Sequence, residues 1–213
     1  MYTIKDYTLY LVLCSENTKG RPILDVASQA IEAGISVLQI REKSLSRQEL
    51  LRSAKGIRSL CRKSSVPFIV NDDPIAAKRL DADGVHLGQE DVKRYPLPLA
   101  RDILGRDKMI GISTHSVEQF LVARKQDFDY IAFGPVFTTK TKDYQIGTSG
   151  IGQVLADCRQ PVIFIGGISL SNIGILTAIG VKNIAVIRAI TEAYNIRLRV
   201  RRLKQALRAG KPD

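Results

Sequence analysis

Eight short apolar runs, each four or five residues long and rich in β-branched side chains, constrain the fold of this chain more than any other feature. Runs of this length are typical of strands buried on both faces, and segments with helical spacing lie between most of them. Strand and helix alternating eight times predict a single α/β domain over residues 1–213, a (β/α)8 TIM barrel. The runs are Leu9–Leu13, Ser36–Ile40, Pro67–Val70, Gly84–Leu87, Met109–Ile112, Tyr130–Phe133, Pro161–Ile165 and Asn183–Ile187.

The main alternative is an open, doubly wound sheet built from the same elements. Its usual fingerprint, a strand followed by Gly-x-Gly-x-x-Gly, is absent from the sequence, which favours the closed barrel. Two helix starts can be predicted within this frame. Ser46-x-x-Glu49 has the pattern of a capping box, and Ser169 precedes the helical spacing of Leu170–Ile179.

The net charge of +11, from 32 basic and 21 acidic residues, raises the question of a nucleic-acid partner. Much of the excess lies between Arg197 and Lys211, where Val200, Leu203 and Leu207 predict an amphipathic last helix with a basic face. No aromatic side chains are interleaved there to stack on bases, so we expect no nucleic-acid partner. No apolar run approaches the roughly 20 residues that span a bilayer, and the first residues lack the pattern of a signal peptide. We therefore expect a cytoplasmic protein without a membrane partner.

Three cysteines and two histidines are too few, and too far apart, to predict a disulfide framework or a zinc cluster. The reactive groups of a barrel gather instead where each strand ends and the next loop begins. After Ser36–Ile40, alternation places Gln39, Arg41 and Lys43 on one side of the chain and Glu42 on the other. Such donors suit an anionic or heterocyclic substrate, although a charged strand end in solvent would have the same pattern.

Carboxylates follow the next two strands. Asp72 lies after Pro67–Val70 and Asp91 after Gly84–Leu87, one β/α unit away, so the barrel can bring the two side chains together. Oxygen ligands from one or two carboxylates, completed by water and phosphate, are what Mg²⁺ accepts. The alternatives are local: Asp91 can be a loop residue, and Asp73, which precedes a proline, can cap the next helix.

The remaining strand ends favour phosphate binding. Ser113 follows Met109–Ile112, where a hydroxyl can bind a substrate or cap a helix. The long loop 134–150 alternates hydroxyls and lysines between glycines and is typical of a lid that closes over an anion. Gly166-Gly167 and Arg188 follow the last two strands, whose loops are the usual phosphate site of this fold.

Taken in order, these motifs resemble the thiamine phosphate synthase family over nearly the whole chain. The matching residues are Gln39–Lys43, Asn71-Asp72, Gly84–Asp91, Gly111–His115, Gly134-Pro135 with Thr139–Lys142, and Gly166-Gly167. The resemblance implies a transferase that joins 4-amino-2-methyl-5-(diphosphooxymethyl)pyrimidine to 4-methyl-5-(2-phosphooxyethyl)thiazole. The products would be thiamine phosphate and diphosphate, with these small molecules as partners, Mg²⁺ as cofactor and a homodimer left open.

The resemblance also assigns roles to residues. The pyrimidine and its diphosphate would be held by Gln39, Arg41, Lys43, Asn71, Ser113 and Lys142, and Mg²⁺ by Asp72 and Asp91. The thiazole phosphate would be held by Thr139, Thr141, Gly167, Ile187 and Arg188. Ile40, Glu42 and Lys140 complete the expected substrate-binding set, within which Arg41, Lys43, Ser113 and Lys142 are the expected catalytic residues.

Two positions depart from the family pattern: Arg188 stands where serine is common, and Thr138 where proline is usual. Two other functions stay open. The sister family of thiazole tautomerases shares the fold, and His115 occupies the position of its acid–base histidine, but a tautomerase leaves Asp72, Asp91 and Lys142 unexplained. The second open function is that of a barrel that binds thiazole phosphate without turnover.

Overall fold

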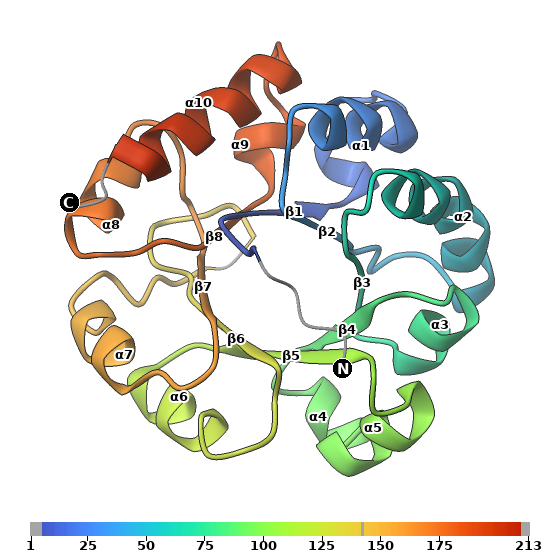
Figure 1. Cartoon of the computed structure of the whole chain (residues 1–213), viewed down its shortest axis with the longest axis horizontal. Coiled ribbons are helices and arrows are strands. Elements are labelled where there is room, and N and C mark those ends of the chain that lie inside the picture. The colour runs from blue at the N-terminus through green and yellow to red at the C-terminus, as the bar shows by residue number, and fades with distance from the viewer. Residues whose placement is uncertain (1–5, 142, 210–213) are drawn as a thin grey trace.

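The computed structural model describes residues 6–141 and 143–209, and its eight parallel strands close into one barrel in chain order. The first strand pairs with the last, and helices surround the barrel (Figure 1). The predicted (β/α)8 TIM barrel is therefore confirmed. The strands are β1 (Leu9–Leu13), β2 (Val37–Ile40), β3 (Phe68–Asn71), β4 (Gly84–Leu87), β5 (Met109–Thr114), β6 (Tyr130–Phe133), β7 (Val162–Ile165) and β8 (Ile184–Val186).

Helices follow the strands on the outside of the barrel, with a short 3-10 turn, η1 (Ser15–Asn17), after β1. Two helices, α4 and α5, lie between β4 and β5, and α9 and α10 follow β8. The helices are α1 (Ile23–Glu32), α2 (Arg47–Lys63), α3 (Pro74–Arg79), α4 (Asp91–Arg94), α5 (Leu97–Leu104), α6 (Val117–Ala123), α7 (Ile151–Asp157), α8 (Ile173–Ala178), α9 (Arg188–Thr191) and α10 (Ile196–Ala209). None of them, in the part of the chain that is described, is long and apolar enough to cross a membrane.

The two predicted helix starts have different outcomes. Ser46 caps α2 through a capping box in which its side chain accepts the Glu49 N–H and the Glu49 side chain accepts the Ser46 N–H, as expected. The helix predicted directly after Ser169 was wrong at its start, because α8 begins at Ile173 with Asn172 at the N-cap. The Ser169 N–H donates instead to Asn172 Oδ1 at 2.8 Å, so a turn separates β7 from the helix.

Side chains inside the barrel form a separate apolar cluster from those packed between the barrel and its helices. The two largest fully buried side chains, Tyr10 and Tyr130, lie in the inner cluster. Glycine at position 111 makes room for one of them: a Cβ there would lie 2.1 Å from Tyr130 Cζ. The interior is thus a packed floor beneath the carboxyl ends of the strands, as in other barrels of this kind.

The last helix, α10, has the amphipathic character expected from the sequence. Val200, Leu203 and Leu207 are buried on its inner face. Two of its cations contact the neighbouring α1 region: Arg197 forms an ion pair with Glu32 at 2.5 Å, and Lys204 Nζ donates to the Gly34 carbonyl at 2.6 Å. These contacts show that part of the basic face holds the helix against the barrel.

Candidate active site

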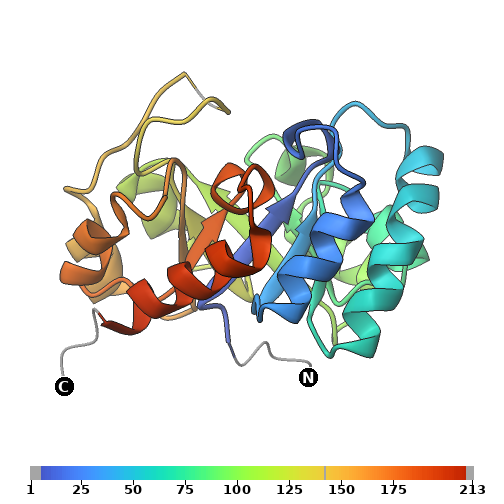
Figure 2. The ribbon, with the colours of Figure 1, turned by 90° about the horizontal axis from the view of Figure 1, so that it is seen from above.

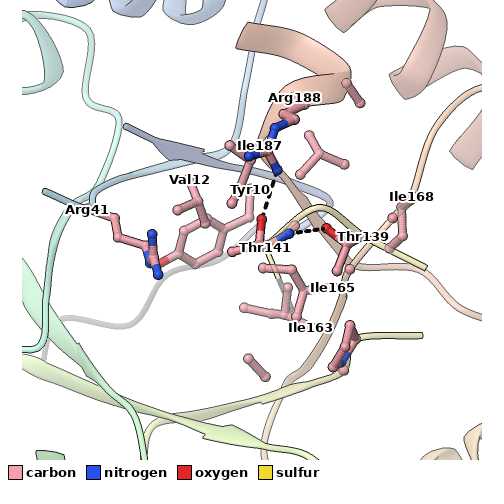
Figure 3. Close-up of a pocket in the computed structure, with 18 of the residues that line it drawn as sticks. Tyr10, Val12, Arg41, Thr139, Thr141, Ile163, Ile165, Ile168, Ile187 and Arg188 are labelled. Carbon is pink, nitrogen blue, oxygen red and sulfur yellow. Dashed lines mark hydrogen bonds between the residues drawn. The ribbon is translucent and has the colours of Figure 1, made fainter. Parts of the chain in front are cut away.

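A cavity of about 370 Å³ opens at the carboxyl ends of the strands. Its walls come from all parts of the barrel, and the loop after β6 rises beside it (Figure 2). Figure 3 shows Arg41, Tyr10 and Arg188 among the residues that line it. The residues predicted from the sequence that line it are Gln39, Arg41, Asn71, Ser113, Thr139, Lys140, Thr141, Gly167, Ile187 and Arg188.

The end of β2 divides its side chains as alternation predicts. Gln39 and Arg41 line the cavity, whereas Glu42 turns away and accepts hydrogen bonds from the backbone N–H and the hydroxyl of Ser15, both at 2.8 Å. Ile40 is buried in the cluster between the barrel and its helices. Lys43 is not among the cavity-lining residues and lies 3.5 Å from Asp72 Oδ2.

Asp72 and Asp91 are brought together, as the sequence predicts. Asp72 has a left-handed backbone with φ of 66°, which aspartate tolerates better than most residues, and its N–H donates to the His86 carbonyl at 2.8 Å. Asp91 Oδ2 accepts the Gly88 N–H at 2.9 Å. Burial, followed by a hydrogen bond with Asp91 and its negative charge, raises the pKa of Asp72 to about 6. Lys43 opposes this shift without cancelling it.

The Asp72–Asp91 pair is better suited to bind a hard divalent cation than to remain as two ionised carboxylates with no cation between them. Two facing carboxylates repel each other when both are ionised, and a Mg²⁺ ion between them would remove that cost. Within the described residues, no group of three or more His, Cys, Asp or Glu side chains could hold a metal ion. A cation bound here would therefore take its other oxygen ligands from water and from a phosphorylated substrate, which is the usual arrangement for Mg²⁺.

Asp73, in contrast, has the structural role that the sequence left open. Its Oδ1 accepts the N–H groups of Ile75 and Ala76 at 2.9 Å, so it caps α3. Its other oxygen, Oδ2, lies 2.5 Å from the Nε of Arg47. With both oxygens occupied in this way, Asp73 is separate from the Asp72–Asp91 pair.

The lid predicted over residues 134–150 is attached to β7 at its start. Val136 N–H donates to the Ile165 carbonyl at 2.9 Å, and Phe137 N–H to the Gly166 carbonyl at 3.1 Å. Glycine is required at the facing position 167, where φ is +64° and a Cβ would lie 2.4 Å from the Thr138 carbonyl oxygen. Lys142, predicted as a catalytic residue of this loop, lies outside the described residues.

Arg188 connects the lid to the end of β8. Its guanidinium donates to Thr141 Oγ1 at 2.8 Å, the contact dashed in Figure 3, and its Nε lies 3.1 Å from Glu192 Oε1. The Thr141 N–H in turn donates to Thr139 Oγ1 at 3.3 Å. Arg188, which departs from the family pattern, therefore already contacts the Glu192 carboxylate and the Thr141 hydroxyl of the lid.

Sequence reasoning missed three polar residues of the cavity floor: Tyr10, His86 and Tyr130. His86 Nε2 lies 2.8 Å from Ser113 Oγ, and His86 Nδ1 lies 3.0 Å from the Tyr130 hydroxyl. A signal was present, since His86 and Ser113 both occupy positions whose alternation points them into the barrel. The apolar character of the surrounding runs concealed it.

Comparisons with known proteins point to one family. The family model described as thiamine monophosphate synthase matches residues 9–190. A thiamine-phosphate synthase from Persephonella marina is 39% identical over 204 residues, covering 95% of this chain and 96% of that protein. The solved structure of a thiamine phosphate pyrophosphorylase from Pyrococcus furiosus has a TM-score of 0.85 and 32% identity, covering 96% of each chain. A geranylgeranylglyceryl phosphate synthase from Thermoplasma acidophilum, at 12% identity and a TM-score of 0.71, covering 96% of this chain and 94% of that one, shares the fold.

Proposed function

Because the chain belongs to the thiamine monophosphate synthase family, we propose that it joins 4-amino-2-methyl-5-(diphosphooxymethyl)pyrimidine to 4-methyl-5-(2-phosphooxyethyl)thiazole, releasing thiamine phosphate and diphosphate. The observation that carries the proposal is one cavity with cations on two sides. Arg41 lines it at the end of β2, and Lys140 of the lid and Arg188 line it beside β7 and β8. The Asp72–Asp91 pair is not among the residues that line the cavity, but it lies near Arg41, whose charge acts on Asp72. Two such sides suit two phosphorylated substrates.

The β2–β5 side is proposed to hold the pyrimidine and its diphosphate. Gln39, Asn71 and Ser113 line the cavity and offer amide and hydroxyl groups to a heterocycle. Arg41 enters the same cavity as a cation for the departing diphosphate. Lys43, next to Asp72, is proposed to contact the same group. Lys142 is proposed as a further contact on the family pattern alone.

Asp72 and Asp91 are proposed to hold Mg²⁺. When bound, the ion would act as a Lewis acid toward the diphosphate oxygens and stabilise the charge that develops as this group leaves. The carboxylates themselves would orient the ion, and Lys43 would keep Asp72 partly neutralised when no ion is present. The donor set supports Mg²⁺ as the cofactor because both protein ligands are hard oxygens.

The β6–β8 side is proposed to hold the thiazole phosphate. Thr139 and Thr141 offer hydroxyls, and Gly167 and Ile187 offer backbone close to the cavity. Arg188 is proposed to contact the phosphate through its backbone, because its guanidinium is already engaged by Glu192. Lys140 lines the cavity and supplies a further cation from the lid.

The reaction needs positioning more than a base. The bond between the pyrimidine methylene carbon and the diphosphate oxygen breaks with its electron pair on the oxygen. The aminopyrimidine stabilises the resulting cation, and the lone pair of the thiazole nitrogen forms the new carbon–nitrogen bond. No proton changes place in this step, so fixed cations and donors around the leaving group supply most of the catalysis.

The remaining expectations stay predictions. Small phosphorylated substrates are the partners that the family supports, and no nucleic acid or membrane is proposed as a partner. A homodimer and a cytoplasmic location likewise stay untested. The tautomerase alternative leaves the Asp72–Asp91 pair without a use, and thiazole binding without turnover leaves the cations around that pair unexplained.

One experiment tests these alternatives together. The full chain is incubated with both substrates, with and without Mg²⁺, and thiamine phosphate is measured by chromatography. We expect product only with the metal, loss of product in Asp72→Ala with Asp91→Ala, and full activity in Glu90→Gln, a control that alters an exposed carboxylate. Absence of product with metal present would overturn the proposed function, and product unchanged in the double variant would overturn the metal assignment.

A further inference from the structure

Five polar side chains form a continuous hydrogen-bonded chain across the floor of the cavity. Each comes from a different strand, and four of the five are buried while Ser113 is partly buried. Gln39 Nε2 lies 2.9 Å from Tyr10 Oη, which lies 3.0 Å from Tyr130 Oη. Tyr130 Oη lies 3.0 Å from His86 Nδ1, and His86 Nε2 lies 2.8 Å from Ser113 Oγ.

The first contact sets the direction of the whole chain. Gln39 Nε2 can only donate, so the Tyr10 oxygen accepts and its own proton is left for Tyr130. Tyr130 then donates to His86 Nδ1. The single ring proton of a neutral His86 therefore lies on Nε2 and is donated to Ser113 Oγ.

The protonation states needed for this direction agree with the burial of the groups. His86 is buried and both of its ring nitrogens lie against hydroxyl groups, an environment that favours the neutral ring with one proton. Burial also raises the pKa of Tyr10 and of Tyr130 above the ordinary value, so both keep their protons. Tyr10, Tyr130 and His86, the three inner members, then each accept one hydrogen bond and donate one, which satisfies these buried polar groups.

We propose that His86 is a positioning residue that acts through Ser113, holding the hydroxyl oxygen with its Nε2–H so that the hydroxyl proton is directed to the substrate. This inference rests on the proposed function for the identity of the substrate. With one lone pair of Ser113 Oγ occupied, the hydroxyl donates toward the cavity. At the other end, Gln39 lines the cavity and its Nε2 donates to Tyr10, so its Oε1 is the acceptor at that end. The chain thus fixes the polarity of the two ends of the pyrimidine side.

A heterocycle with an amino group and ring nitrogens matches this polarity. Its amino group donates to an acceptor such as Gln39 Oε1, and a ring nitrogen accepts from a donor such as Ser113. If every hydrogen bond of this set were donated in the opposite direction, Ser113 would donate to His86 Nε2 and Gln39 would present its amide N–H groups to the cavity. The subsite would then suit a heterocycle that bears a carbonyl oxygen.

The tautomer of His86 can be measured directly in the unmodified full chain. The sequence contains two histidines, and the other one supplies an internal reference. His115 Nδ1 lies 2.7 Å from the Gly134 carbonyl oxygen, which can only accept, so His115 carries its proton on Nδ1. Nitrogen NMR of histidine-labelled protein near pH 7 should show His86 protonated on Nε2 and not on Nδ1, with His115→Gln used for assignment. Two rings protonated on Nδ1, or a charged His86, would overturn the proposal.

Activity measurements test whether His86 acts through Ser113. We expect His86→Leu to lower kcat/KM about tenfold or more, the loss of one oriented hydrogen bond to a reacting ligand. In a Ser113→Ala background the same substitution should cost no more than about twofold, because the positioned group is gone. His86→Gln, which keeps one donor and one acceptor, should recover most of the activity. Equal losses from His86→Leu in both backgrounds would contradict the proposal.

A matched control separates this role from simple packing. Tyr7 lies in the same inner cluster, but its hydroxyl contacts Met109 Sδ at 3.7 Å and is not a member of the hydrogen-bonded chain. Tyr7→Phe should leave kcat/KM unchanged, whereas Tyr130→Phe should allow both tautomers of His86 to appear in the NMR spectrum. A Tyr130→Phe spectrum identical to that of the parent would contradict the proposed direction. If the parent made no thiamine phosphate, the proposed function would fail while the NMR result still decided the direction of the chain.

Discussion

Replacing Asp72 by asparagine should stabilise the protein at neutral pH when no metal is bound. The folded state raises the pKa of this carboxyl from 3.8 to about 6, first by burial and then through Asp91. Because the folded protein binds this proton more tightly than the unfolded chain, the stabilisation is complete below about pH 4 and is lost as the pH rises through about 6. A shift of about two pKa units corresponds to up to about 3 kcal/mol. Asp72→Asn should avoid this loss of stability, because asparagine has no carboxyl group to ionise.

The assay is urea unfolding of the parent and Asp72→Asn between about pH 4 and pH 8, with a chelator present. The variant should gain up to about 3 kcal/mol over the parent at pH 8 and nothing at pH 4. Added Mg²⁺ should stabilise the parent and not the variant, because the ligand pair is incomplete. Glu90→Gln, which alters an exposed carboxylate and keeps the Asp72–Asp91 pair, should follow the parent across this pH range. A difference between parent and Asp72→Asn that stays constant across this pH range would refute the reasoning.

Three further substitutions test other parts of the molecule. Arg188→Ser should raise the KM for the thiazole phosphate only a few-fold, since the guanidinium already binds Glu192; a loss of hundreds-fold in a steady-state assay would show that the guanidinium itself holds the phosphate. Gly111→Ala should destabilise the fold by about 1–3 kcal/mol or more in urea, because the new Cβ would overlap the Tyr130 ring; unchanged stability would contradict this packing. Ser46→Ala should cost about 1 kcal/mol in the same assay through loss of the cap on α2, and a variant as stable as the parent would show that the cap contributes nothing.

The fold and the general position of the site could be predicted because their signals are local. A parallel strand buried on both faces is apolar along its whole length, so each run identifies itself without knowledge of its neighbours. Polar residues directly after such runs, such as Arg41 and Asp72, must then lie at one end of the barrel. The capping box at Ser46 was equally visible, because it involves residues three apart in the chain.

The contacts that could not be predicted join residues far apart in sequence. Tyr10 and Tyr130 meet only because β1 and β6 face each other across the closed barrel, and nothing in either run marks the partner. The same holds for Arg188 and Thr141, which lie 47 residues apart. The start of α8 was predicted wrongly for a different reason. Ser169 is a good capping residue, but the glycine turn before it leads into a further turn closed by Asn172.

Phosphorus NMR of the full chain with both substrates and Mg²⁺ tests most directly that one cavity joins two phosphorylated molecules with loss of diphosphate. Inorganic diphosphate and thiamine phosphate should appear together in equal amounts, and both should disappear when either substrate is left out. Diphosphate that forms without the thiazole phosphate, or a thiazole signal that changes while the pyrimidine diphosphate is untouched, would contradict a joining reaction in this barrel.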